Sequence, residues 1–407
     1  MIFGYELGML AGSRGTMLLA VALLCGCGGA GLAQSAGVQE SEAAKQAMAL
    51  EQQGRFAEAA ESWRTVAEKN PRDATAFAGM GLDLARQGKY PEAVAAYEKA
   101  LRLNPHIPGL QLDLGLALFK QGKLDEAIAP LKLAVAAAPG NAQAGILLGM
   151  SYYGTSQYAA AVPYLRTAVE RAPENVEMRG VLAQSCLHAK EYNCVLEQYK
   201  QILAVNPESA QAHMLAGEAL DGMHETGEAI GEFQAAEKAA PTEPNVHFGL
   251  GYLLWTKGQH PEAAKEFQAE IDNEPRHLQA MLYLADSEMQ LNRADDARPS
   301  LEKLVKISPD NAMAHLDLGI VYAEQGRKQN ALAEFQTAIK IAPNNVNARW
   351  RLGRLYRSMG MPLQAKAEFD KASSLNKAED ERLLKVMSTI PGSNRTSPAG
   401  VTAPTNK

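Results

Sequence analysis

The chain has 407 residues, of which 46% are hydrophobic and 21% are charged, and its formal net charge at pH 7 is −6. This composition supplies enough apolar side chains for a buried core, so most of the chain is expected to fold. The negative net charge excludes the broad basic field that draws proteins to nucleic-acid backbones or to anionic lipid. We therefore expect no nucleic-acid partner.

The chain contains four cysteines, and Cys25 and Cys27 lie within the first thirty residues. Only Cys186 and Cys194 remain for the rest of the chain. That number excludes a disulfide-dense scaffold and a four-cysteine zinc site.

Residues 1–33 have the pattern of a signal peptide. Residues 17–27 form the apolar run MLLAVALLCGC, which follows Arg14 and precedes the small-residue sequence Gly-Leu-Ala at 31–33. Such a run with a small-residue cleavage site is typical of secretory signals. The sequence therefore predicts an exported protein, periplasmic or secreted, with residues 34–39 as a short linker at the start of the mature chain.

Two alternatives to cleavage at residue 33 remain open. The sequence Leu-Cys-Gly-Cys at 24–27 resembles the lipobox of bacterial lipoproteins, which would make Cys27 a lipidated first residue anchored at the envelope. An uncleaved segment would instead act as a membrane anchor, although the apolar run is short for a span. Membrane contact is expected only through one of these two anchors.

Beyond the signal, proline recurs at an interval of 34 residues without insertion or deletion. It occupies position 32 of nine successive repeats, at Pro71, Pro105, Pro139, Pro173, Pro207, Pro241, Pro275, Pro309 and Pro343. Fixed self-similarity of this length is the signature of a repeat architecture. Ten repeats follow, beginning at residues 40, 74, 108, 142, 176, 210, 244, 278, 312 and 346.

Other positions of the repeat predict a helical hairpin. Position 8 is Gly or Ala in every repeat, position 20 is Ala in all but repeat 5, and position 24 is large and apolar throughout. Small residues at positions 8 and 20 let two helix backbones approach, and the side chain at position 24 fills the space beside them. A glycine at position 15 in six repeats supplies the turn, and the proline at position 32 ends the second helix.

These positions identify a resemblance to the tetratricopeptide repeat (TPR) family, whose units are 34 residues long with the same small, large and proline positions. The resemblance covers residues 40–379. It implies an all-α solenoid, a right-handed superhelix of helical hairpins whose first helices line a concave surface. Residues 380–390 are predicted to form a separate cap helix that closes the last hairpin, and residues 391–407 a disordered tail.

No catalytic constellation is recognisable in the sequence, which has no phosphate-binding glycine loop, nucleophile elbow or HExxH motif. We therefore expect a protein that is not an enzyme and that has no cofactor, no metal and no small-molecule substrate. His213, His247 and His315 share position 4 of their repeats. Neighbouring first helices are too far apart for one ion to bind such a column, so these histidines are expected to be packing residues.

Cys186 and Cys194 lie four residues before and four residues after the turn of repeat 5. Two alternatives remain open: a disulfide across the hairpin in an oxidising compartment, or two buried thiols.

The resemblance implies that positions 2, 5, 9, 12 and 13 of the first helices face a partner. These candidate binding residues form an apolar and aromatic strip with arginines at its end: Leu112, Leu116, Phe119, Ile146, Met150, Tyr153, Phe248, Tyr252, Trp255, Leu282, Met289, Trp350, Arg354 and Arg357, with Leu316 and Ile320 between them. Aromatic side chains and arginine are enriched at interaction hot spots. The expected function is an interaction scaffold that binds a peptide or protein segment; the alternative is a structural or self-assembling component of an envelope complex.

Overall fold

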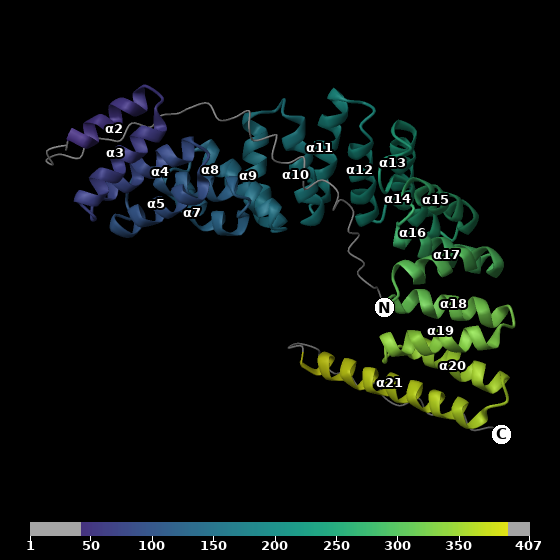
Figure 1. The fold of residues 1–407 in the computed structure, drawn as a ribbon. Helices are drawn as coiled ribbons and strands as arrows, with labels where there is room; N and C mark the ends of the chain where they lie inside the picture. The colour runs from purple at the N-terminus through teal and green to yellow at the C-terminus, as the bar shows by residue number, and fades with distance from the viewer. Residues whose placement is uncertain (1–41, 390–407) are drawn as a thin grey trace, which may run out of the picture. The chain divides into compact units, whose positions relative to one another are not determined.

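The computed structural model describes residues 42–389, with side chains described as far as residue 378. The described chain forms helices α2 to α21 and contains no strand. It divides into two compact parts, Met1–Pro241 and Thr242–Lys407, which we call the N-terminal and C-terminal bodies. Within each body the helices pair into antiparallel hairpins that stack side by side (Figure 1). The predicted all-α fold class is therefore confirmed.

Each repeat contributes one first helix and one second helix. The N-terminal body contains the first helices α2 (Glu42–Gln52), α4 (Ala74–Arg86), α6 (Leu110–Lys120), α8 (Ala142–Gly154), α10 (Val176–His188) and α12 (Ala210–Gly222). Its second helices are α3 (Phe56–Lys69), α5 (Tyr90–Leu103), α7 (Leu124–Ala137), α9 (Tyr158–Arg171), α11 (Tyr192–Val205) and α13 (Thr226–Ala239).

The C-terminal body has the same organisation. Its first helices are α14 (Val246–Thr256), α16 (Leu278–Gln290), α18 (Ala312–Glu324) and α20 (Val346–Ser358). Its second helices are α15 (His260–Asn273), α17 (Ala294–Ile307), α19 (Lys328–Ile341) and α21 (Pro362–Thr389). Every first helix begins at the predicted start of its repeat or two residues after it.

The residue before each first helix explains these starts. In seven repeats it accepts a hydrogen bond from the third residue of the helix: Asp73, Asn141, Asn175, Ser209, His277, Asn311 and Asn345. Helices α6 and α14 follow Pro108 and Pro244 instead, begin two residues later, and have no side-chain cap at Gly109 and Asn245. Those two residues are left-handed, with φ of 78° and 69°.

All ten hairpin turns place a left-handed residue at position 15. Six repeats have glycine there, and Ser156, Lys190, His224 and Asn292 adopt φ between 58° and 67° in the other four. Repeat 5, which has Lys190 in place of the turn glycine, therefore keeps the same turn geometry.

The packing inside a hairpin follows the predicted positions. A Cβ added to Gly81, at position 8, would lie 2.6 Å from the ring of Tyr97, at position 24, and 3.3 Å from the carbonyl oxygen of Ala93, at position 20. The same substitution at Gly319 would meet Phe335 at 2.6 Å. Such distances leave no room for a side chain, so the small residue sets the distance between the two helices.

The prediction of a separate cap helix is corrected by the last helix. Helix α21 runs without interruption from Pro362 to Thr389 and so includes residues 380–389. Position 32 of repeat 10 is Lys377 rather than proline, so nothing at that point removes a helical N–H or blocks the next turn. Prolines inside second helices, by contrast, do not end them: α7, α9 and α17 continue through Pro130, Pro163 and Pro299.

Several predictions lie outside the described residues. These are the signal peptide at 1–33 with the candidate lipidation site Cys27, the linker at 34–39 and the tail at 391–407. Among helices of the described part, none combines the length and apolar character needed to cross a membrane.

Candidate functional site on the first-helix face

The first-helix face is the surface formed by positions 2, 5, 9, 12 and 13 of the first helices. The structure divides the predicted binding residues on this face by exposure. Phe119, Met150 and Phe248 are buried, as are Leu316 and Ile320. These five side chains pack between neighbouring helices and offer a partner almost no surface, so their assignment as contact residues is corrected.

The other predicted residues retain accessible surface. The half-buried ones are Leu112, Leu116, Ile146, Tyr153, Tyr252, Trp255, Leu282 and Met289, and the exposed ones are Trp350, Arg354 and Arg357. The half-buried residues combine a base packed on the array with an accessible edge, which is the exposure expected of a contact residue.

Neighbouring first helices are linked on this face by a recurring hydrogen bond. In the N-terminal body the hydroxyl of Tyr153, at position 12, donates to Oε1 of Gln184, at position 9 of the next repeat. In the C-terminal body Nε1 of Trp255, also at position 12, donates to Oδ2 of Asp286, again at position 9, at 2.6 Å. The register thus fixes which residue of the next first helix meets position 12.

An aromatic cluster surrounds the Trp255–Asp286 bond. The Tyr283 ring centroid lies 5.1 Å from that of Trp255 and 5.6 Å from that of Tyr252, in edge-to-face geometry. The same ring reaches Phe248 and Phe267 at 5.9 and 5.6 Å. Edge-to-face pairs at these distances stabilise one another, so the cluster is held in a defined shape.

Sequence reasoning missed Tyr283 because position 6 was not assigned to the face. It missed Asp286, at position 9, because only apolar, aromatic and arginine side chains were selected as contact residues. The signal that could have found Asp286 was an acidic residue within an otherwise apolar strip.

Carboxyl groups on the first helices lie in poorly solvated surroundings. Burial raises the pKa of Asp317 to about 7; the nearby Asp286 carboxylate adds to the rise and Arg351 opposes it. Burial likewise raises the pKa of Glu218 to about 7 and that of Asp113 to about 6. A cationic group arriving from outside would stabilise the ionised form of such carboxyls.

A second recurring contact joins position 4 to position 23 of the same hairpin. His213, His247 and His315 lie 2.7, 2.7 and 2.6 Å from the carboxylates of Glu232, Glu266 and Glu334. In repeat 10 the pair is Arg349 and Glu368, at 2.9 Å. The histidines are therefore packing residues that also contact a glutamate on the second helix of the same hairpin.

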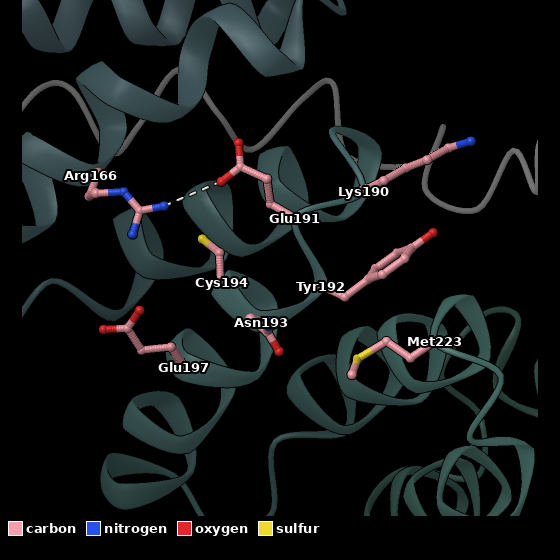
Figure 2. Close-up of a pocket in the computed structure, with 8 residues that line it drawn as sticks. All are labelled: Arg166, Lys190, Glu191, Tyr192, Asn193, Cys194, Glu197 and Met223. Carbon is pink, nitrogen blue, oxygen red and sulfur yellow. Dashed lines mark hydrogen bonds and ion pairs between the residues drawn. The ribbon is translucent and has the colours of Figure 1, made fainter.

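Cys186 and Cys194 are joined as a disulfide, with their Cα atoms 6.0 Å apart. Of the two alternatives left open, the structure thus contains the bridge across the repeat 5 hairpin. The Cys194 sulfur adjoins a hollow of about 500 Å³, whose lining residues are shown in Figure 2. An ion pair of 3.4 Å joins Arg166 to Glu191 across its edge. Its lining includes charged side chains of both signs, Arg166 and Lys190 together with Glu191 and Glu197.

A cluster of potential metal ligands in the C-terminal body is engaged in helix capping. Glu270 accepts the backbone N–H groups of Asn245 and Phe248 at 2.9 and 3.1 Å. Nδ1 of His277 accepts the N–H of Ala280 at 3.0 Å. The remaining ring nitrogen, Nε2 of His277, lies 3.0 Å from Oδ1 of Asn245, so both side chains are engaged at the starts of α14 and α16.

Comparison with known sequences gives a consistent match. Models described as tetratricopeptide repeat match residues 44–79, 78–142, 196–244, 220–277, 248–312 and 282–346 in one case, and residues 152–219 and 322–390 in another. Together these matches cover most of the described chain. A comparison with curated proteins gives no match.

Solved structures with similar folds include YrrB, described as a TPR protein with an unusual peptide-binding site, at 19% identity. The alignment covers 47% of this chain and 98% of YrrB, with a TM-score of 0.41. MamA from Desulfovibrio magneticus RS-1 aligns at 19% identity over 42% of this chain and 97% of its own, with a TM-score of 0.41. A complex of Naa15 and Naa10 bound to HypK aligns at 16% identity over 82% of this chain and 63% of the other, with a TM-score of 0.43.

Proposed function

This chain belongs to the tetratricopeptide repeat family, a non-enzymatic scaffold fold for protein–protein interaction, and on that premise we propose that it binds a partner segment on the first-helix face of the C-terminal body. The proposed contact surface is the cluster of Tyr252, Trp255 and Tyr283 together with Asp286. The partner is a protein or peptide segment with an apolar side that covers the rings.

One observation carries this proposal: the cluster is prearranged yet only half-buried. Trp255 is fixed by its 2.6 Å hydrogen bond to Asp286 and by its edge-to-face contact with Tyr283 at 5.1 Å. Rigid aromatic side chains lose little conformational entropy when they bind, which is why they dominate interaction hot spots. The adjoining Asp317, whose pKa burial raises to about 7, favours a partner that brings a basic side chain beside the rings.

Site-specific photo-crosslinking tests the surface. A benzophenone amino acid replaces Tyr252 in one protein and Lys265, an exposed residue of helix α15, in a matched control. Both proteins are irradiated in extract of the native host, and crosslinked peptides are identified by mass spectrometry. We expect the position 252 probe to capture one recurrent partner segment that Trp255→Ala removes. Equal capture by the position 265 probe, or capture that Trp255→Ala leaves unchanged, would contradict the proposed surface.

We place this activity outside the cytoplasm, either in the periplasm or in the medium, with lipid anchoring through Cys27 as the alternative. The support is the apolar run at 17–27 followed by Gly-Leu-Ala at 31–33. Mass spectrometry of the purified N-terminus distinguishes a chain starting at Gln34, a lipidated Cys27 and an intact residue 1. The last outcome, combined with recovery in the soluble cytoplasmic fraction, would contradict export.

A further inference from the structure

The register of the repeats defines which residues each hairpin presents to the next first helix. In repeat 7 the Tyr283 ring, at position 6 of the next repeat, lies 5.9 Å from Phe248 at position 5 and 5.6 Å from Phe267 at position 24. Trp255, at position 12, donates to Asp286, at position 9 of that repeat. Positions 5, 12 and 24, with Tyr252 at position 9, therefore form the seat for the following helix.

In repeat 10 this seat consists of Trp350, Arg354, Arg357 and Phe369, which we call the end face. The difference in exposure is large at position 5: Trp350 is 48% exposed, whereas Phe248 and Leu316 are 2% and 1% exposed. Helix α21 extends past Lys377 as one straight element, so no described first helix covers the end face.

The end face keeps the aromatic base of the earlier seats and gains positive charge. The rings of Trp350 and Phe369 lie 4.7 Å apart, and the Arg357 guanidinium lies 5.9 Å from the Phe369 ring. Arg354 and Arg357 replace the Tyr252 and Trp255 of repeat 7. Both arginines are exposed, and among the described residues neither guanidinium has a hydrogen-bond or carboxylate partner.

We propose that the end face binds an amphipathic helix of a partner protein, seated as an eleventh first helix. The partner helix carries an aromatic or large apolar residue against Trp350 and Phe369. Three residues later it carries an Asp or Glu that pairs with Arg354 and Arg357. The pattern follows Tyr283 and Asp286, which occupy the corresponding positions on the seat of repeat 7. Charge-assisted bonds from arginine to carboxylate give the site its preference for an acid.

A second copy of the chain does not satisfy this chemistry. Its own first helix, α2, would bring Lys45 to position 6 and Met48 to position 9. Lys45 would bring a charged side chain against Trp350 and Phe369, where the proposed occupant has a large apolar residue, and Met48 would face the two arginines without supplying a negative charge. The occupant is therefore a different protein, and the site is distinct from the Tyr252–Trp255–Tyr283 cluster.

The test uses the 407-residue chain and a fluorescent, hydrocarbon-stapled helical peptide with the sequence of residues 278–290, LQAMLYLADSEMQ. This probe carries Tyr283 and Asp286 in the required spacing, and stapling supplies the helicity that so short a peptide lacks. Binding is measured by fluorescence anisotropy. The protein variants are Arg354→Glu with Arg357→Glu and, as a matched control, Arg276→Glu, which reverses an exposed charge between α15 and α16.

We expect saturable binding that the double reversal weakens at least tenfold and that Arg276→Glu leaves unchanged. A peptide with Asp286→Lys should lose affinity for the natural chain and regain it on the doubly reversed protein. Absence of binding, or binding that is indifferent to the two reversals, would overturn the proposal.

Two further measurements separate this site from its rivals. If Trp255→Ala rather than the arginine reversals abolishes binding, the peptide is exchanging with α16 and the end face is not its site. If light scattering shows that the chain self-associates and that the double reversal abolishes the association, the occupant is a second copy and the partner-helix assignment is overturned. The crosslinking experiment at position 252 and the peptide-binding experiment on the end face use different residues. A negative result in one does not change the other, so the two proposals can fail independently.

Discussion

His315 contacts Glu334 on the second helix of its own hairpin, with 2.6 Å between its Nδ1 and the carboxylate. The other ring nitrogen, Nε2, lies 3.1 Å from the carbonyl oxygen of Pro309, which ends the preceding repeat. Arg349 repeats the arrangement, with Glu368 at 2.9 Å and the carbonyl of Pro343 at 2.7 Å. The side chain at position 4 thus joins the proline that ends one repeat to both helices of the next.

The first prediction concerns this link. His315→Arg should keep the free energy of unfolding within about 0.5 kcal/mol of that of the natural chain, because Arg349 already contacts the corresponding groups in repeat 10. A double-mutant cycle with His315→Leu and Glu334→Leu should give a coupling energy of about 1 kcal/mol, measured by urea denaturation. Additive effects of the two leucine substitutions would show that the pair is not coupled.

The second prediction concerns the start of α14, which lacks a side-chain cap of its own. Both oxygens of the buried Glu270 accept backbone N–H groups there, from Asn245 and Phe248. Glu270→Ala should lower the free energy of unfolding by about 2 kcal/mol, because it leaves two donors without an acceptor. The neighbouring exposed residue provides the control, since Glu274→Ala should change the stability by less than about 0.5 kcal/mol. Equal losses of stability from the two substitutions would show that Glu270 does not stabilise the start of α14 by capping it.

These residues show why the sequence predicted the hairpins and missed the links between them. Spacing alone located the helices, since Gly81 and Tyr97 each have one steric role that recurs every 34 residues. The role of Glu270 was not predicted, because it depends on the missing cap at Asn245, twenty-five residues earlier. A pattern of residue types does not show which atoms meet.

The candidate site was predicted in part for the same reason. Trp255 was placed on the first-helix face by its position, but its partner Asp286 lies in the next repeat. Phe248 was assigned to the same face and is 2% exposed, because Tyr283 covers it. The position of a residue within a repeat therefore predicts the helix face on which it lies. Its exposure depends on the size of the side chain that the neighbouring repeat places over it.

The third prediction concerns Asp83, which is 0% exposed and whose carboxylate oxygens have no hydrogen-bond partner within the described part of the chain. Burial raises the pKa of Asp83 from its ordinary value near 3.8 to about 7, with a further rise from Glu51 and an opposing effect of Arg86. The folded chain therefore holds the Asp83 proton more tightly than the unfolded chain does. Ionisation of Asp83 costs no stability below about pH 4, and its cost to the free energy of unfolding grows as the pH rises toward 7.

Asp83→Asn should remove this loss. We expect the variant and the natural chain to have equal stability near pH 4 and the variant to be more stable by roughly 1–3 kcal/mol at pH 8, the cost of a buried unpaired group. Thermal unfolding followed by circular dichroism at the two pH values checks both parts. Asp125→Asn, on an exposed residue of α7, should show no such pH-dependent difference. A gain of equal size at both pH values would contradict titration of Asp83 as the cause.

The fourth prediction concerns the bridge between Cys186 and Cys194, which closes a loop with a sequence separation of 8 across the turn at Lys190. Closing a loop of this size restricts the unfolded chain and stabilises the folded one by about 2–3 kcal/mol. Replacing both cysteines by serine should lower the stability by about that amount. Reduction of the natural chain should have a similar effect and should change nothing in the serine variant.

Peptide mapping of the non-reduced protein checks the bridge directly. The peptides that contain Cys186 and Cys194 should run as one linked species that separates on reduction, and alkylation before reduction should label neither residue. Two alkylated thiols in protein purified from an oxidising compartment would show that the pair is reduced in the native chain. In that case the hairpin of repeat 5 would depend on the packing of Val195 and on the left-handed turn at Lys190 for its stability.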